Sequence, residues 1–438
     1  MKINDSLFGT SGIRKIADKE LVELALKVGL ALGDSYKELI VGGDTRTSSS
    51  ALRKAVLAGL EAAGARCYDA GVLPTPTLAI AAEDFDAAVM VTASHNPPQY
   101  NGLKLINPDG SAFDNGQKKH IEETIKKLRA SCVKWDSFGG TKEYEGAITR
   151  HINRIKEYFV DDLKGLRLVL DCGGGAGSVI TPLLLEGLGC EVIKINCQQT
   201  GFFPRGIEPL EKNLGKLLET VRKFGAALGI AHDGDADRMM AVDDKGKFIP
   251  GDQLLLLLAN AIGAKELITT LDASMAVEEF SFKVKRTPIG DNYVSERLKY
   301  EGDFGGEPSG SWIFPNNTLC PDGIIAAVYL AFVAKEQNIS EIVEKLPSYP
   351  IIRDSIAVDS LVDMKYISEG IKELKAIRID KTDGYRVSFK DGWLLIRPSG
   401  TEPKIRITAE GKTVESTENI YARGIELIKK SISNKVER

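Results

Sequence analysis

Short apolar runs alternate with helix-length amphipathic stretches along most of this 438-residue sequence. Such alternation predicts βα units that form mainly parallel sheets. One unit occurs three times: an apolar run that ends near an aspartate and a polar turn, an amphipathic helix, and a second apolar run. The three aspartates are Asp44, Asp171 and, in a looser copy, Asp272. The repetition predicts three related α/β domains.

Each of the three units is followed by another apolar run that ends in an unusual polar loop. The loops read MVTASHNP at 90–97, GIAHDGDADR at 229–238 and FGGEPSGSW at 304–312. In parallel α/β sheets, ligands gather at the carboxyl ends of strands, where loops and helix N-termini present backbone N–H groups. We therefore expect the three loops to face one shared cleft.

The pattern changes after LPSYPIIRDS at 346–355, a Pro-containing stretch suited to a linker. Short strand-like runs and one final helix follow, which predicts a fourth, smaller α+β domain. The predicted domains are residues 1–148, 149–250, 251–350 and 351–438. A hinge near Pro350 would let the fourth domain open and close the cleft.

Composition limits the classes of partner. The chain is 43% hydrophobic and 27% charged, as is typical of globular domains, and its formal net charge of −4 offers no basic excess for a nucleic-acid backbone. The six cysteines are dispersed, with no CxxC and no zinc-type Cys/His cluster, so we expect reduced thiols. The start, MKINDSLFGTSG, lacks the apolar region of a signal peptide, and the most apolar stretch, 254–264, is shorter than a membrane span. We expect a cytoplasmic protein with neither nucleic acid nor membrane as a partner.

The DGDADR segment predicts a metal site. Its aspartates, Asp233, Asp235 and Asp237, stand at alternate positions, so their carboxylates can converge on one cation. Oxygen ligands favour Mg²⁺, Mn²⁺ or Ca²⁺ over zinc. An EF-hand loop is excluded, because Arg238 and Asp244 occupy the positions where it needs Gly and Glu. A solvated acidic turn is the other interpretation, but three acids at the end of an apolar strand are costly to cluster without a counter-ion.

Ser94 is a candidate nucleophile. It stands beside His95 and before the rigid turn at 96–98, with Lys104 nearby in the sequence. A serine hydroxyl is a weak nucleophile unless a base or a metal acts on it. No G-x-S-x-G motif surrounds Ser94, which argues against an α/β-hydrolase. From these residues alone, a catalytic serine and a turn-capping serine both stay open.

Two further segments suit a phosphorylated sugar. RPSGTEPKIR at 397–406 follows an apolar run and gathers guanidinium groups, hydroxyls and backbone N–H groups around a Gly turn, a set that matches phosphate oxygens. An ordinary strand-end turn is the alternative. GEPSGS at 306–311 presents Glu307 and Ser309, which are suited to hydrogen bonds with sugar hydroxyls. The candidate phosphate-binding residues are Arg397, Ser399, Gly400, Thr401 and Arg406.

The segment DCGGGAGS at 171–178 is similar to a dinucleotide fingerprint but does not match it. Gly173 and Gly175 are not followed by the third glycine, and the next apolar run ends at Asn196 instead of an acid. No G-x-x-x-x-G-K-[ST] segment occurs either. The sequence therefore argues against NAD and against a P-loop nucleotide site.

Four of these segments, TASHNPPQYNGLK, DGDADR, GEPSG and RPSGTEPKIR, closely resemble motifs of the α-D-phosphohexomutase family, in the same order. The resemblance covers nearly the whole chain. It implies four domains around a central cleft, the first three of related topology. It also implies that Ser94 is carried as phosphoserine, whose phosphate holds one Mg²⁺ per chain together with Asp233, Asp235 and Asp237.

The resemblance further implies a mutase reaction. The phosphate on Ser94 would pass to a hexose monophosphate and give a hexose 1,6-bisphosphate, which turns over in the cleft and returns its other phosphate to Ser94. The resemblance implies that Lys104, the first choice as base, and His95 transfer protons, and that Arg14 and Arg238 neutralise charge. It implies that Glu307 and Ser309 bind the sugar and that the Arg397 loop binds the phosphate that does not react.

The substrate follows from finer matches. FGTSGIR and SGTEPKIR are more similar to the branch of the family that acts on glucosamine phosphate than to the phosphomannomutases. Pro288, Pro308 and Ser311 depart from residues common in relatives. We expect conversion of glucosamine 6-phosphate to glucosamine 1-phosphate, with mannose or glucose phosphate as the alternative. A metal-dependent sugar phosphatase and a catalytically silent sugar-phosphate sensor are the other classes considered, and a homodimer stays open.

Overall fold

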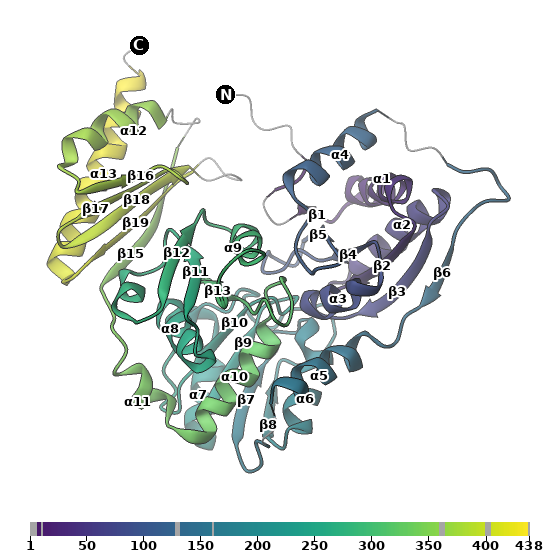
Figure 1. Ribbon diagram of the computed structural model, residues 1–438, viewed down its shortest axis with the longest axis horizontal. Coiled ribbons are helices and arrows are strands. Elements are labelled where there is room, and N and C mark those ends of the chain that lie inside the picture. Colours follow the sequence, from purple (N-terminus) through teal and green to yellow (C-terminus); the bar gives the residue numbers. More distant parts are fainter. Residues whose placement is uncertain are drawn as a thin grey trace.

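Four sheets, one after another along the chain, make up the fold. The structure is a computed structural model that describes residues 7–9, 12–127, 132–159, 162–358, 364–398 and 404–436. The first three sheets contain both parallel and antiparallel strands, and the fourth is entirely antiparallel (Figure 1). No described helix combines the length and the apolar composition that crossing a bilayer requires.

The first sheet and its helices form the N-terminal part of the chain. The strands are β1 (Ile13–Ile16), β2 (Glu38–Gly43), β3 (Arg66–Val72), β4 (Ala87–Val91), β5 (Tyr100–Ile106) and β6 (Gly140–Glu143), and the helices are α1 (Lys19–Ser35), α2 (Ser49–Ala62), α3 (Thr75–Ala81) and α4 (Asn115–Lys126). Helices α1 and α2 pack closely, because a Cβ on Gly29 would lie 2.2 Å from the carbonyl oxygen of Val56. At the sheet edge, β1 pairs with β5 and brings Arg14 opposite Gly102.

The second and third sheets follow in the middle of the chain. The second comprises β7 (Arg167–Asp171), β8 (Glu191–Ile195), β9 (Leu228–His232) and β10 (Met239–Val242), with α5 (Ala147–Tyr158), α6 (Thr181–Gly187) and α7 (Gly215–Phe224). The third comprises β11 (Glu266–Thr270), β12 (Lys283–Thr287), β13 (Phe304–Glu307) and β14 (Ser311–Ile313), with α8 (Gly251–Ile262), α9 (Asp291–Leu298), α10 (Gly323–Glu336) and α11 (Ile339–Val343). Between β11 and β12 only a short 3₁₀ helix, Met275–Glu279, is present, which agrees with the looser sequence pattern around Asp272.

The first three sheets share one strand order. It reads β5-β4-β2-β3 in the first, β10-β9-β7-β8 in the second and β14-β13-β11-β12 in the third. In each sheet the last three strands are parallel, and the first strand forms an antiparallel hairpin with its neighbour. The expected three related α/β domains are confirmed.

The polar loops of the sequence occupy the same place in all three sheets. Residues 92–99 connect β4 to β5, residues 233–238 connect β9 to β10, and residues 308–310 connect β13 to β14. Each loop is thus the turn of the hairpin at the carboxyl end of the parallel strands. The second and third loops contact each other directly, because the N–H of Met239 donates to the carbonyl oxygen of Gly310 over 2.9 Å.

The second and third domains share one hydrophobic core. Buried residues of both segments, from Ile155 to Ile339, form a single cluster. The apolar run that begins at Leu254 belongs to α8, and Leu254 to Leu258 are all buried in this core. These two domains therefore fold against each other rather than as separate units.

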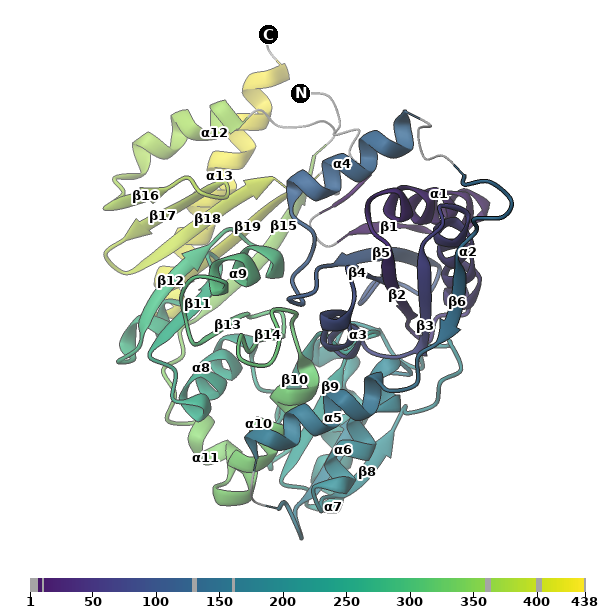
Figure 2. The same ribbon diagram turned by 45° about the vertical axis from the view of Figure 1, so that its right-hand side comes forward.

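The C-terminal sheet is smaller and has its own core. Its order is β15-β19-β18-β17-β16, and the strands are β15 (Ile351–Ala357), β16 (Arg378–Asp380), β17 (Tyr385–Phe389), β18 (Gly392–Pro398) and β19 (Lys404–Gly411). Helices α12 (Met364–Ile371) and α13 (Val414–Val436) cover one face (Figure 2). A small apolar cluster of Leu271, Trp393 and Leu395 joins this domain to the third one.

A buried histidine connects the first and third domains. His151 on α5 lies with its Nδ1 2.9 Å from the hydroxyl of Thr77 on α3 and its Nε2 2.9 Å from Oδ2 of Asp322. The other carboxylate oxygen of Asp322 accepts two backbone N–H groups at the start of α10. His151 and Asp322 have no exposed surface, so both depend on these contacts for hydrogen bonding.

We expect His151→Leu to lower the melting temperature, measured by differential scanning calorimetry. The substitution leaves the Thr77 hydroxyl and the Asp322 carboxylate buried with fewer partners, and each unsatisfied buried polar group costs roughly 1–3 kcal/mol. His120→Leu is the matched control, because His120 is an exposed residue of α4. Equal melting temperatures for the two variants would contradict the role of His151 between the domains.

Candidate active site

Ser94 is the third residue after the end of β4, in a backbone conformation that non-glycine residues rarely adopt. Its φ is +50°, in the left-handed region. The side chain is buried, and its Oγ donates to Oδ2 of Asp233 over 2.7 Å, although the two residues are 139 positions apart. The same Oγ lies 3.2 Å from Nδ1 of His95. The structure therefore brings the candidate nucleophile against the first candidate metal ligand.

Asp233, Asp235 and Asp237 form a compact buried group. Each offers a carboxylate oxygen within 4.8 Å of the others, and none is more than 4% exposed. Burial and the charges of the neighbouring aspartates raise the pKa of Asp233 and of Asp237. Within the described part of the chain, Oδ1 of Asp235 and Oδ1 of Asp237 have no hydrogen-bond partner. A cluster of hard oxygen donors with two orphaned atoms fits a divalent cation such as Mg²⁺.

Lys104 on β5 supplies the nearest positive charge to these acids. Its Nζ lies 2.7 Å from Oδ2 of Asp235 and 2.5 Å from Oδ2 of Asp237. Burial alone would lower the pKa of Lys104, but the two carboxylates outweigh it and raise that pKa. Conversely, burial would raise the pKa of Asp235, and the Lys104 charge overcomes this and lowers it. In this arrangement Lys104 is an ammonium group that balances the acids.

Arg14, His95 and Arg238 add further donors near Ser94. Arg14 donates to Oδ1 of Asn96 over 2.9 Å, while its buried Nε has no partner among the residues that the structure describes. Arg238 donates its backbone N–H to Asp233. The charge of Arg238, burial and the charge of Arg14 lower the pKa of His95 far below its usual range, so its ring is neutral near pH 7. Arg14, Arg238 and Lys104 form a positively charged lining that suits an anion.

Glu307 ends β13 beside the loop at 308–310. It is buried, and its Oε1 accepts the N–H of Gly290 over 2.8 Å. Burial, with the charges of Asp291 and Asp272, raises the pKa of Glu307 to about 8. Ser309 is exposed, and its hydroxyl is only loosely placed, 3.4 Å from the Glu307 carboxylate. Glu307 and its neighbours Asp291 and Asp272 therefore form an acidic group that contrasts with the cationic lining around Ser94.

The C-terminal domain contributes arginines on two neighbouring strands. Arg397 on β18 stands opposite Arg406 on β19 in the antiparallel register. Arg397 forms an ion pair of 2.9 Å with Asp383, and the Asp383 carboxylate also accepts the N–H of Ile289 in the third domain over 3.1 Å. Arg406 is exposed. The other predicted residues of this loop lie outside the described residues: Ser399, Gly400 and Thr401.

Several contacts at the site were not predicted from the sequence. Thr75 donates its hydroxyl to Asp235 over 2.5 Å, and Arg238 pairs with Glu208 at 3.0 Å. Asp44 and Asp171 were noticed only as markers of the repeat, yet both accept hydrogen bonds from buried arginines. The sequence signal that could have indicated these contacts is that both aspartates stand at the end of equivalent strands of the repeat. The partner arginines stand at different distances in the sequence, two residues after Asp44 and 34 residues after Asp171, so no common motif identifies them.

Family models for all four domains of phosphoglucomutase/phosphomannomutase match the chain. Alpha/beta/alpha domain I matches residues 5–131, domain II residues 149–246, domain III residues 250–349 and the C-terminal domain residues 360–426. The matches follow one another in the same order as the four sheets.

Whole-chain relatives are also found. A protein of Methanococcoides burtonii described as a probable phosphoglucosamine mutase is 45% identical over 436 residues, which cover 98% of this chain and 100% of the relative. The phosphoglucosamine mutase of Methanococcus maripaludis is 39% identical, with 98% of this chain and 100% of the relative covered. The crystal structure of a phosphoglucomutase/phosphomannomutase family protein from Burkholderia thailandensis has a TM-score of 0.87 at 25% identity, with 98% of each chain covered.

The raised pKa of Glu307 predicts a pH dependence of stability. A carboxyl group whose pKa is higher in the folded state contributes stability that is present at low pH and is lost as the pH rises from about 4.5 to about 8. In metal-free buffer, the melting temperature of the unmodified protein should therefore fall relative to that of Glu307→Gln over this range. Glu20→Gln, at an exposed position on α1, is the control. Parallel pH curves for the protein and Glu307→Gln would show that Glu307 does not titrate as expected.

Proposed function

Because this chain belongs to the α-D-phosphohexomutase family, we infer that it is an isomerase that moves a phosphoryl group within a hexose phosphate, and that it is a phosphoglucosamine mutase. The whole-chain relatives with that name, at 39% to 45% identity, support this choice over a phosphomannomutase or phosphoglucomutase. The reaction interconverts glucosamine 6-phosphate and glucosamine 1-phosphate.

One observation carries the mechanism: Oγ of Ser94 lies 2.7 Å from Asp233 and inside a lining of Lys104, Arg14 and Arg238. We propose that Ser94 carries the transferable phosphoryl group. Its bond to Ser94 Oγ breaks as a bond forms to the free hydroxyl of the hexose monophosphate, whose proton leaves to a base. The resulting 1,6-bisphosphate then turns over and returns its other phosphoryl group to Ser94, which releases the isomer. Charge neutralisation rather than covalent chemistry lowers the barrier of such transfers.

The proposed cofactor is one Mg²⁺ per chain. Asp233, Asp235 and Asp237 would hold it, together with the phosphate on Ser94. When bound, Mg²⁺ supplies positive charge to the phosphoryl oxygens. Two observations support this assignment. Asp235 and Asp237 each have one carboxylate oxygen without a partner, and among the described residues Lys104 is the only cation at hydrogen-bond distance from these two acids.

Lys104 and His95 are the proposed proton carriers. The neutral ring of His95, 3.2 Å from Ser94 Oγ, can accept a proton at Nδ1. Lys104 can act as a base only when Asp235 and Asp237 have another cation as partner, since both carboxylates stabilise its ammonium form. Arg14 and Arg238 are proposed to neutralise the transferring phosphoryl group.

The other end of the substrate is assigned to the third and fourth domains. We propose that Glu307 and Ser309 bind the sugar, and that Arg397 and Arg406, with Ser399, Gly400 and Thr401, bind the phosphate that is not reacting. The acidic surroundings of Glu307 suit the ammonium group of an amino sugar. The domain boundaries after 148, 250 and 350, a cytoplasmic location and a homodimer stay predictions of the sequence.

Ser94→Ala removes the proposed phosphoryl carrier. We expect turnover of glucosamine 6-phosphate to fall at least about a thousandfold, as for other nucleophile deletions, and mass spectrometry to detect no phosphate on residues 92–104 after incubation with the bisphosphate. Ser340→Ala is the control, because Ser340 bonds to Asp244 away from the three loops. A Ser94→Ala protein with normal turnover would remove Ser94 from the mechanism.

Substrate preference tests the acidic sugar site. With each bisphosphate as activator, we expect kcat/KM for glucosamine 6-phosphate to exceed the values for glucose and mannose 6-phosphates by at least about tenfold, or roughly 1.4 kcal/mol. Glu307→Gln should narrow this difference, because a bound ammonium group favours the ionised form of Glu307 and the substitution removes the negative charge that this form would offer. An equal loss for all three sugars would contradict the ammonium assignment. Release of inorganic phosphate without any bisphosphate would instead indicate a phosphatase.

A further inference from the structure

We propose that two buried pairs, Asp44–Arg46 and Asp171–Arg205, are equivalent positioning devices, one for the Ser94 loop and one for the loop of Asp233. Neither pair contacts the reacting atoms. The first holds the backbone of the Ser94 loop, the second holds His232, the last residue of β9, from which the loop of Asp233 starts, and together they set the approach of Ser94 Oγ to the carboxylates proposed to bind the metal. This inference rests on the proposed function of both loops.

Arg46 is the centre of the first device. Its side chain has no exposed surface, and its Nε donates to Oδ2 of Asp44 over 3.0 Å. The remaining four N–H groups of the guanidinium all donate to backbone carbonyl oxygens of a single loop. These acceptors, at 2.7–2.9 Å, belong to Ser94, Asn96, Pro97 and Tyr100. The loop is therefore wrapped around one fully satisfied guanidinium.

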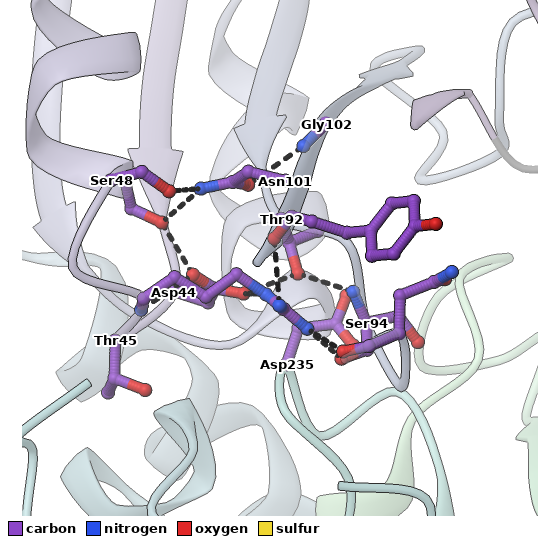
Figure 3. A network of polar contacts seen from close by, with 12 residues as sticks. Asp44, Thr45, Ser48, Thr92, Ser94, Asn101, Gly102 and Asp235 are labelled. Atoms are coloured by element: carbon purple, nitrogen blue, oxygen red, sulfur yellow. Dashed lines mark hydrogen bonds and ion pairs between the residues drawn. The ribbon is translucent and has the colours of Figure 1, made fainter. Parts of the chain in front are cut away.

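The Asp44 carboxylate fixes the other side of Ser94 (Figure 3). Oδ2 of Asp44 accepts the hydroxyl of Thr92 over 2.7 Å, and Thr92 Oγ in turn accepts the N–H of Ser94 over 2.9 Å. Arg46 holds the carbonyl of Ser94, so both peptide groups of the serine are fixed by the same ion pair. Ser49 also donates to Asp44, over 2.6 Å, and keeps the carboxylate in place.

Arg205 is the centre of the second device, and its Nε pairs with an aspartate Oδ2 as the Nε of Arg46 does. Its Nε donates to Oδ2 of Asp171 over 3.0 Å, and one terminal nitrogen donates to the carbonyl of His232 over 2.7 Å. His232 directly precedes Asp233. A Cβ on Gly173 would lie 2.9 Å from this arginine, and Gly173 has a φ of +59°, so a glycine is required for the close approach.

The two pairs occupy equivalent places in the repeated sheet. Asp44 follows β2, which pairs with β4, and Asp171 ends β7, which pairs with β9. In both, Oδ1 accepts the N–H of the residue two positions later, and Oδ2 accepts an arginine Nε–H. The third copy differs: among the described contacts of Asp272, Arg353 donates to its carbonyl oxygen rather than to its carboxylate. The device is thus found at the two loops that are proposed to meet the transferring phosphoryl group.

Backbone strain gives a reason for such support. Ser94 and Ala236 have φ of +50° and +55°; Ser94 lies in the loop that Arg46 holds, and Ala236 lies in the loop that follows His232, which Arg205 holds. Non-glycine residues stay in this region only when the surrounding structure forces them to. Without the arginines, these loops can relax toward ordinary conformations, which moves Ser94 Oγ away from Asp233. A displacement of about 1 Å at a reacting group can cost about 100-fold in rate.

The test replaces each arginine with lysine, which keeps the charge but not the five-donor fork. For Arg46→Lys we expect kcat and the single-turnover rate of phosphoryl transfer from bisphosphate to Ser94 to fall about 10- to 100-fold, with KM and the Kd for Mg²⁺ unchanged. For Arg205→Lys we expect the Kd for Mg²⁺, measured by isothermal titration calorimetry, to rise about tenfold or more, as for residues that support metal ligands. The two variants thus differ in which constant changes.

Controls remove surface arginines that also pair with acids. Arg66 pairs with Glu38 at the amino ends of β2 and β3, and Arg167 pairs with Glu191 at the amino end of β7. Arg66→Met and Arg167→Met should leave kcat and the Mg²⁺ affinity unchanged. Circular dichroism and melting curves show whether each variant folds.

Thr92→Val provides a second route to the first device, because it removes only the hydroxyl that links Asp44 to the Ser94 N–H. If Arg46→Lys and Thr92→Val fold and retain the transfer rate, or if both fail to fold while the controls fold, the pair is structural and the proposal is wrong. An unmodified protein that transfers no phosphoryl group to Ser94 would instead contradict the proposed function, and the change in Mg²⁺ affinity of Arg205→Lys would still test the second device.

Discussion

Three carboxylates buried within 4.8 Å of one another are the constraint on which the rest of this active site depends. Their mutual repulsion must be balanced, because buried charges without partners are expensive. The protein brings the balancing charge from another domain: Lys104 lies on β5 of the first sheet, and the acids follow β9 of the second. The ion pairs that balance the buried acids therefore also link the first two domains.

The repeat explains why these groups can meet at all. Each of the first three sheets ends its parallel strands in a hairpin turn, and the Ser94 hydroxyl, the three carboxylates and Glu307 lie in or next to these turns in succession. One topology used three times thus presents three chemistries at equivalent positions. The second and third turns are joined directly, by the bond from Met239 to Gly310 and by the indole N–H of Trp312, which donates to the carbonyl oxygen of Met239 over 2.7 Å.

Sequence reasoning predicted the features that are local in the chain. The three α/β repeats and the aspartates of DGDADR could be predicted because both the periodicity of strands and the spacing of metal ligands involve residues that are close in the sequence. Ser94 and Arg14 needed the family resemblance, since Ser94 meets Asp233 only across 139 positions and Arg14 reaches the site through the pairing of β1 with β5. The role of Arg46 could not be predicted for the same reason, because its carbonyl partners lie 48 to 54 residues away. Any residue type has a backbone carbonyl, so the sequence does not indicate which carbonyl groups accept these hydrogen bonds.

The way apolar residues are shared among the domains decides which parts of the molecule can move separately. The carboxylates and Glu307 belong to the second and third domains. These two domains share one hydrophobic core and therefore form one rigid unit. The C-terminal sheet has its own core and meets that unit through the small apolar cluster of Leu271, Trp393 and Leu395 and through polar contacts such as those of Asp383 with Ile289 and of Arg353 with Asp272. Under the proposed mechanism, reorientation of the bisphosphate would then depend on tilting of the C-terminal sheet, while the carboxylates and Glu307 keep their relative positions.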